Sequence, residues 1–341
     1  MNDESAKNKH KKDIPMKKTS HADNFQEGAV GVVRIRNQKP NNPHCHTFTE
    51  VVLILSGEGI HYTRQKHIPI ACGDVFVIPP GQVHDYFSTR HLRLVNLLID
   101  QNKMPLPFLD LEDLPGFQYL FNVEPRLPLA DSLPKRLSLS FEDILECDRM
   151  LAGIEAMMKT RAPGFRYQAA VEAYRVIYYI CTHVSAEHPS MKSGYGRLAE
   201  ILSRIASQPQ QSYDLTRLAQ ESCLSQRSFR RIFQRITGMP PLRYINRMRI
   251  RLACELLKKP DLTIEEVANS VGFDDSNYFS RQFRKIMNMA PREYRQSLMP
   301  DSRFPSKTPH VNSQNMRNGA PLYSFADHFP GSGKNHGSAE K

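Results

Sequence analysis

The sequence predicts an α+β protein of two domains, in which a β-barrel with a helical pair precedes an all-α domain with two helix-turn-helix units. Residues 28–100 hold short segments rich in Val, Ile, Leu and Phe, separated by Gly or Pro, as in barrels and sandwiches. Residues 141–184 show apolar side chains at helical spacing. Further along, Phe229 and Phe233 recur as Phe279 and Phe283 within a repeated helix-turn-helix pattern.

Both ends of the chain are expected to be disordered tails. Residues 1–26 are rich in Lys and poor in large apolar side chains, and residues 299–341 are rich in Pro, Ser, Asn and Gly. Neither segment carries enough apolar surface to offset the entropy that folding would cost.

The barrel is expected within residues 27–140. We predict its strands at residues 29–36, 50–55, 59–64, 74–78 and 92–99, where β-branched and aromatic residues cluster between turn residues. Residues 106–139 are rich in Pro and Leu and favour no particular element.

Residues 141–189 are predicted to form an antiparallel helix pair, with helices at 141–158 and 167–184. The apolar surface of these helices exceeds what one pair can hide, which predicts a homodimer held by this segment. Residues 190–197 contain Ser and two Gly and suggest a linker to a helical domain at residues 198–298.

The positive charge of the chain is unevenly distributed. The net charge is +11 over 341 residues, and between Lys192 and Arg295 there are 19 Lys or Arg against 10 Asp or Glu. The first 20 residues add six Lys against three acids, so the remainder is nearly neutral. A basic domain joined to a neutral one predicts a polyanion-binding module attached to a second function.

The cysteines and the apolar runs indicate a cytoplasmic protein. The six cysteines have no paired spacing, which argues against a disulfide framework or a zinc site and favours a reducing compartment. Residues 51–55 form the longest apolar run near the start and are too few to cross a bilayer. The Lys-rich start lacks the apolar region of a signal peptide, so no membrane contact is expected.

Each helix-turn-helix unit has the residues of a major-groove reader on its second helix. In the first unit Asp214 and Ser225 are expected to cap the two helices, and arginines occupy the face opposite the apolar one. Arg can donate two hydrogen bonds to guanine, Asn can pair with adenine, and an acid can accept from cytosine. A solvated charged face is the alternative. The predicted DNA-contacting residues are Gln226, Arg227, Arg230, Arg231, Gln234, Asp275, Ser276, Asn277 and Arg281.

The second unit, from Ile264 through Gly272-Phe273 and Tyr278-Phe279 to Phe283-Arg284 and Pro291, resembles the signature of the AraC/XylS family of bacterial transcription regulators. The resemblance covers residues 203–295. Two positions depart from the family pattern, with Cys223 where a Gly is usual and Asn288 where a Gly often ends the helix. The Asp-Ser-Asn-Tyr-Phe run at 275–279 and Cys223 further resemble activators of rhamnose operons.

Residues 43–86 resemble the two motifs of the cupin barrels: His44-x-His46 with Glu50 and Gly57, then Gly73 followed by Pro79-x-Gly81 and His84. In metal-binding cupins the four positions of His44, His46, Glu50 and His84 hold a divalent transition metal. AraC-type sensor barrels commonly keep this framework without metal and bind a small effector there. We predict the second case, with no metal or other cofactor and with an effector site formed by His44, His46, Glu50, His84, Tyr86 and Arg34.

These resemblances imply a sequence-specific, ligand-responsive transcription regulator rather than an enzyme. We expect an activator of a sugar-catabolism operon, with rhamnose as the first candidate sugar. The expected partners are double-stranded DNA, RNA polymerase, a monosaccharide effector and a second copy of the chain. A metal-dependent cupin enzyme or a metal sensor fused to a DNA-binding domain is the alternative, and metal content distinguishes the two.

Overall fold

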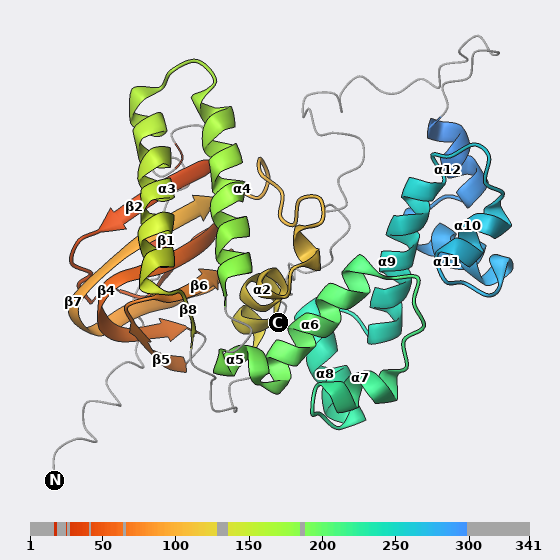
Figure 1. The fold of residues 1–341 in the computed structure, drawn as a ribbon, viewed down its shortest axis with the longest axis horizontal. Helices are drawn as coiled ribbons and strands as arrows, with labels where there is room; N and C mark the ends of the chain where they lie inside the picture. The colour runs from red at the N-terminus through yellow and green to blue at the C-terminus, as the bar shows by residue number, and fades with distance from the viewer. Residues whose placement is uncertain are drawn as a thin grey trace, which may run out of the picture. The chain divides into compact units, whose positions relative to one another are not determined.

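A computed structural model describes residues 28–40, 42–63, 66–127, 136–184 and 188–298, together with Lys17, Lys18 and Phe25. The predicted tail at 299–341 and most of the tail at 1–26 lie outside these residues. The chain forms two compact units (Figure 1): one comprises residues up to 208 with 213–237, and the other comprises 209–212 with the residues from 238 onward.

Two long antiparallel strands, β4 (Thr49–Thr63) and β7 (His84–Ile99), organise the N-terminal β-domain. The first half of β4 lies between β6 (Asp74–Ile78) and the second half of β7, which also pairs with β2 (Val30–Ile35). The second half of β4 pairs with β5 (Lys66–Ala71) and with the first half of β7. Register shifts between Ile54 and Ile60 of β4 separate the two halves. Short strands complete the sheet: β1 (Lys17–Lys18), β3 (His44–Cys45) and β8 (Leu137–Ser138).

Part of the N-terminal segment is ordered, which corrects the prediction of a tail up to residue 26. Lys17 and Lys18 pair in parallel with His44 and Cys45. Phe25 is buried, and its ring lies edge-on to that of Phe48, with 5.2 Å between centroids. The aromatic side chain explains the difference, because burying it stabilises an otherwise polar segment.

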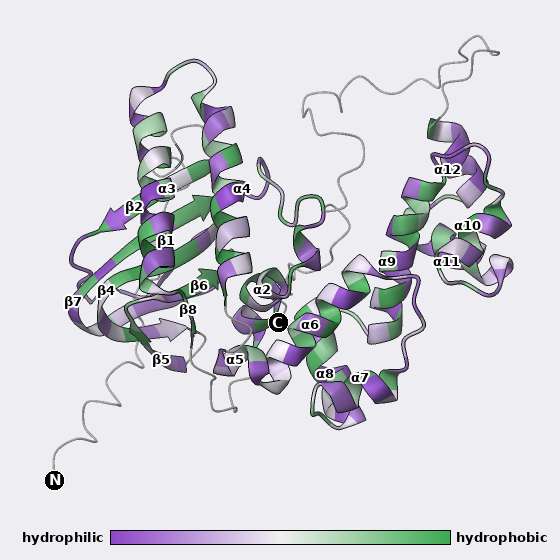
Figure 2. Ribbon diagram, viewed as in Figure 1, coloured by the Kyte–Doolittle hydropathy of each residue, from purple (hydrophilic) through white to green (hydrophobic). Residues whose placement is uncertain are grey.

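The two faces of β4 have different surroundings. Val52 and Ile54 belong to a buried apolar cluster with Phe76 of β6 and Tyr86 of β7, and Glu50 is two residues before Val52, on the same face. In Figure 2 the central part of the sheet is largely hydrophobic, whereas β5 and part of β2 are hydrophilic. Helices α3 (Phe141–Thr160) and α4 (Phe165–His183) pack on each other and against β2, as the antiparallel pair predicted from the sequence (Figure 1).

Within the segment 106–139, which favoured no element, residues 111–126 form a chain of short helical turns. These are η1 (Leu111–Asp113), α2 (Pro115–Phe117), η2 (Gln118–Val123) and η3 (Glu124–Arg126). Of these, η1, α2 and η2 pack against α6 (Gly194–Ser207). The Ser203 hydroxyl of α6 donates a hydrogen bond to the Asp113 carbonyl of η1.

The predicted linker at 190–197 is wrong. Helix α5 (Pro189–Lys192) and the first turn of α6 occupy it, and Ser193 caps α6 by accepting from the Gly196 amide. A Cβ at Gly196 would collide with the Met191 carbonyl, so this glycine permits close packing.

The repeat seen in the sequence is present as two equivalent helix-turn-helix units. Helices α7 (Leu215–Glu221) and α8 (Gln226–Thr237) correspond to α10 (Ile264–Ser270) and α11 (Ser276–Met287). Helices α9 (Pro241–Leu256) and α12 (Pro291–Leu298) follow them. The turns of the two units match, since Cys223 (φ 54°) and Gly272 (φ 89°) both adopt the left-handed conformation. No helix among the described residues is both long and apolar enough to span a lipid bilayer.

Candidate functional site

Helix α8 presents a polar, basic face opposite its apolar one. Phe229 and Phe233 are fully buried in the core of the unit. The five residues predicted to contact DNA on this helix are all exposed: Gln226, Arg227, Arg230, Arg231 and Gln234. Gln226 donates to the Thr216 hydroxyl of α7, so it also links the two helices.

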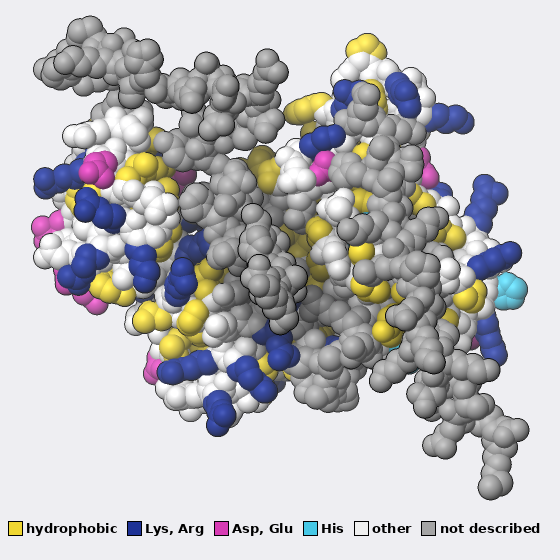
Figure 3. Space-filling view, turned by 180° about the vertical axis from the view of Figure 1, so that it is seen from behind, with side chains coloured by type: hydrophobic (Ala, Val, Ile, Leu, Met, Phe, Trp, Pro, Cys, Tyr) yellow, Lys and Arg dark blue, Asp and Glu magenta, His cyan; other side chains and the backbone are white. Residues whose placement is uncertain are grey.

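The three arginines of α8 have free guanidinium groups. Arg204 and Arg217 each form an ion pair with Glu221. Among the described residues, no acid forms an ion pair with Arg227, Arg230 or Arg231. Exposed Lys and Arg side chains are frequent over the helices of the C-terminal part of the chain, which lie on the left in Figure 3. Five donors per guanidinium, with no internal partner, suit either phosphates or base edges.

Helix α11 holds its predicted residues in different roles. Asn277 and Arg281 are exposed and available, whereas Ser276 is half-buried. One carboxylate oxygen of Asp275 accepts from the amides of Asn277 and Tyr278, so Asp275 caps the helix. The sequence did not reveal this capping role, because the same acid suits either purpose, and the base contact of Asp275 stays a prediction.

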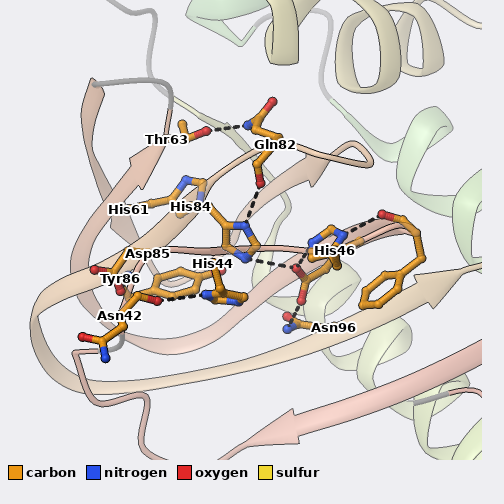
Figure 4. A network of polar contacts seen from close by, with 12 residues as sticks. Asn42, His44, His46, His61, Thr63, Gln82, His84, Asp85, Tyr86 and Asn96 are labelled. Carbon is orange, nitrogen blue, oxygen red and sulfur yellow. Dashed lines mark hydrogen bonds and ion pairs between the residues drawn. The ribbon is translucent and has the colours of Figure 1, made fainter. Parts of the chain in front are cut away.

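A second site lies inside the β-domain, where polar side chains are buried together (Figure 4). The Nε2 atom of His46 lies 3.0 Å from Oε2 of Glu50, and Nε2 of His84 lies 3.5 Å from the same oxygen. The possible ligand atoms of these three residues are all within 4.8 Å of one another. The other Glu50 oxygen accepts from the Asn96 amide.

The histidines of this cluster are oriented by backbone carbonyls. Nδ1 of His46 lies 2.7 Å from the Phe48 carbonyl oxygen, and Nδ1 of His84 lies 3.2 Å from that of Gln82. A carbonyl only accepts, so Nδ1 of each histidine carries a proton, and Nε2 of each faces Glu50. Two imidazole nitrogens this close to one carboxylate oxygen can share a proton with it or bind a cation together with it.

Burial shifts the titration of this cluster. Burial by itself raises the pKa of the Glu50 carboxyl, but the hydrogen bond with His46 and the nearby His84 bring that pKa below its usual value. Burial lowers the pKa of His84 to about 4. Glu50 is therefore ionised and His84 neutral at neutral pH.

A polar group that the sequence did not single out lies beside this cluster. Nη2 of Arg136 lies 2.6 Å from Nδ1 of His61, and Nη1 lies 2.5 Å from Oε1 of Glu124. The guanidinium also lies over the Phe76 ring, 3.8 Å from its centroid. His61 is opposite Tyr86 in the register of β4 and β7, and the ring centroids are 5.1 Å apart. Nothing in the sequence could place Arg136, because it comes from the segment without a clear pattern.

The predicted effector residues are brought together only in part. His46, Glu50 and His84 form the centre, and Tyr86 lies next to His84, with 6.4 Å between ring centroids. His44 is half-buried at the edge, with its ring 4.2 Å from that of His84, and it is not one of the three residues whose ligand atoms converge.

Arg34 is a correction to the predicted effector site. Its guanidinium binds Asp148 and lies 2.6 Å from Oε2 of Glu155, both on α3. Arg34 therefore anchors the helix pair to β2, because the alternation along β2 directs it to the outer face.

Both parts of the chain match known families. Residues 30–154 match the AraC-like ligand binding domain, and residues 218–297 match a helix-turn-helix domain. The chain is 27% identical over 270 residues to the HTH-type transcriptional activator RhaR of Mannheimia succiniciproducens, covering 79% of this chain and 92% of that protein. It is 27% identical over 285 residues to the HTH-type transcriptional activator RhaS of Klebsiella pneumoniae, covering 81% and 96%.

Among solved structures, the chain is similar to the DNA-binding domain of AdpA in complex with a target DNA. The identity is 30% and the TM-score is 0.29, with 30% of this chain and 91% of that chain covered.

Proposed function

Because its two parts match the AraC-like ligand binding domain and a helix-turn-helix domain, we propose that this chain is a transcription regulator that binds a small effector in its β-domain and DNA through α8 and α11. The exposed, unpaired arginines of α8 support this most directly, since they stand on the second helix of a duplicated helix-turn-helix. Selection from random DNA should yield sites with two half-sites read by Arg227, Arg230 and Arg231 and by Asn277 and Arg281. Failure to enrich any sequence over non-specific DNA would refute this function.

The direction of regulation is proposed from the relatives. The proteins that resemble this chain over about four fifths of its length are named transcriptional activators, which supports activation together with RNA polymerase in the cytoplasm. We propose a monosaccharide effector and take L-rhamnose as the first to test. In a reporter assay L-rhamnose should raise transcription, and Glu50→Gln should reduce that response, because the variant removes the charge that His46 and His84 face.

A homodimer through α3 and α4 completes the proposal. Tyr167, Val171 and Tyr178 form one exposed apolar stripe on α4, and Phe141 and Leu145 are exposed on α3. Light scattering of the full chain should give twice the monomer mass, and Val171→Lys should shift the mass to that of a monomer. A monomeric wild type at roughly 10 μM, where a standard interface is stable, would contradict this interface.

A metal-dependent function is the second candidate, because the three side chains of the cluster fit a transition metal. Two imidazole Nε2 lone pairs and one carboxylate are ligands that zinc, iron or manganese accept. His46, Glu50 and His84 would hold the ion, which would supply Lewis acidity to a bound molecule. Elemental analysis separates the candidates: one ion per chain, lost in His84→Ala, supports a metal sensor or a cupin enzyme, whereas metal-free protein with a sugar response supports the first proposal.

A further inference from the structure

The group of Arg136, His61 and Tyr86 contains hydrogen-bond donors that lack acceptors. The side-chain nitrogens Nε of Arg136 and Nε2 of His61 and the hydroxyl of Tyr86 are buried and have no hydrogen-bond partner. All three residues are more than nine-tenths buried. Leaving such a group unpaired is costly, so a site of this kind indicates a missing partner.

The protonation of this group is fixed by Arg136. A guanidinium only donates, so the Nδ1 atom of His61 must accept from it, and the His61 proton is on Nε2. Burial and the charge of Arg136 hold the pKa of His61 well below its usual value, which keeps the ring neutral. Burial raises the pKa of Tyr86, so its hydroxyl keeps its proton. The three orphaned atoms therefore offer protons to a ligand.

Two orphaned acceptors complete the set. The Oε1 atom of Gln82 and the Oδ1 atom of Asn96 are buried without a donor. Both residues adjoin His84 and Glu50 within the same network (Figure 4). A ligand that satisfies this cluster must both accept and donate, as hydroxyl groups do.

The charges of the cluster disfavour an anionic ligand. The guanidinium of Arg136 is already paired with Glu124, and Tyr86 lies in the field of Glu50 and Asp85. A carboxylate or phosphate would meet uncompensated like charges in a buried site.

We infer that Arg136, His61 and Tyr86 form a subsite for the hydroxyls of an uncharged, polyhydroxylated effector, and that the Arg136–Glu124 pair transmits its binding to the first helix-turn-helix unit. This inference rests on the proposed function, whose effector it describes. It adds Arg136 and His61 to the predicted effector residue Tyr86, and it adds a route from the effector to the helix-turn-helix unit.

The route of transmission follows from the contacts of Glu124. This residue begins η3 directly after η2, and η2 packs against α6 and α8 of the first helix-turn-helix unit. A ligand that accepts from Nε of Arg136 binds the same guanidinium whose Nη1 is paired with Glu124 of η3. Occupancy of the subsite thereby favours one arrangement of η2 and η3, and the DNA-binding unit that rests on them responds.

The closing experiment measures calorimetric binding of L-rhamnose, D-galactose and the anionic D-galacturonate to the full chain. At least one neutral sugar should bind, and Tyr86→Phe should weaken it about 3- to 10-fold, the loss of one hydrogen bond. The ligand-free Tyr86→Phe protein should melt no lower than wild type, because the lost hydroxyl had no partner. Tyr62→Phe, on the opposite face of β4, is the matched control and should bind as wild type.

Transmission is tested with Glu124→Gln, which removes the charge and keeps the shape of the side chain. A saturating neutral sugar should change the DNA affinity of wild type about 5- to 150-fold and that of Glu124→Gln by less than about threefold. The subsite is overturned if galacturonate binds and neither neutral sugar does, or if the Tyr86→Phe protein binds the neutral sugar as tightly as wild type. Either result leaves the proposed regulator function standing. A Glu124→Gln protein that responds like wild type overturns the transmission. A wild-type protein that binds no DNA sequence in preference to others would instead refute the proposed function.

Discussion

Arg230→Ala tests whether the basic face of α8 reads bases or only attracts the phosphate backbone. The side chain is exposed and has no ion pair, and its neighbour Phe229 carries the packing of this turn. The substitution should therefore change the free energy of unfolding by no more than about 0.5 kcal/mol. Any larger change in DNA binding must then come from a lost contact with DNA.

The size of that change distinguishes the possible contacts. A bidentate contact with guanine contributes about 1–3 kcal/mol, so the dissociation constant for the selected site should rise about 5- to 150-fold. The loss should vanish when one base pair of the half-site is changed, and the dependence on salt should stay the same. A phosphate contact would weaken all sequences alike and reduce the slope of log K against log salt by about 0.9.

Fluorescence anisotropy at three salt concentrations, with wild type, Arg230→Ala and the control Arg217→Ala, measures both quantities. Arg217 is exposed on α7, and its Nε lies 3.2 Å from Oε1 of Glu221, so its removal should leave base preference unchanged. A uniform loss with a smaller salt slope for Arg230→Ala would refute base recognition by this residue. No loss at all would make the face of α8 a solvated surface.

Three further predictions concern stability. Cys223→Gly should raise the free energy of unfolding by about 1 kcal/mol in chemical denaturation, because a glycine has no penalty at φ 54°. Gly272→Ala should lower the free energy of unfolding by more than that, because φ is 89° and the new Cβ would meet the Gln210 carbonyl. Equal stability of the two variants would refute the shared turn geometry. Phe283→Ala should cost about 3–5 kcal/mol, and calorimetry should show the loss in the unit formed from residue 238 onward; a loss shared by both units would contradict their separate cores. Burial and Arg136 hold the pKa of His61 in the folded protein well below the ordinary 6.5, so the unfolded chain takes up the proton first as the pH falls. The melting temperature should therefore fall as the pH falls below about 6.5. His61→Gln should flatten this pH dependence, and an unchanged profile would assign the titration to another group.

The helices and turns of the helix-turn-helix half could be predicted nearly in full, because the same residue pattern occurs in both units. Each capping and turn position in the first unit has an equivalent in the second, and both Cys223 and Asn288 adopt the left-handed conformation that the family glycines would supply. The capping role of Asp275 could not be separated from a DNA contact, since one carboxylate suits both.

The β-domain was predicted less completely, and its glycines explain why. Gly57 suggested a turn between two strands, but β4 continues through it to Thr63. Its positive φ of 79° belongs to the irregular part of the β4–β7 ladder, where a Cβ would collide with the Arg90 and His91 carbonyls. A glycine therefore marks both chain reversals and close backbone approaches, and local sequence cannot distinguish them.

The candidate effector site was found only where a motif marked it. His46, Glu50 and His84 follow a fixed spacing, so their convergence could be expected. The contacts of Arg136 with His61 and Glu124 join residues far apart in the chain, and no periodic pattern reports such contacts. Arg34 was misplaced because the sequence alone did not show which face of β2 the helices cover.

The packing of α6 against η1 and η2 determines where this regulator can be divided and recombined. The compact unit that contains the β-domain continues through residue 237, so a cut at residue 190 would separate α6 from the surface it covers. A hybrid that joins this β-domain to a foreign DNA-binding module would expose apolar surface on both fragments. A junction near Gly238, where the first helix-turn-helix unit ends, keeps that contact intact. The compact unit that contains the β-domain is thus larger than that domain and includes α8, one of the two helices proposed to read DNA.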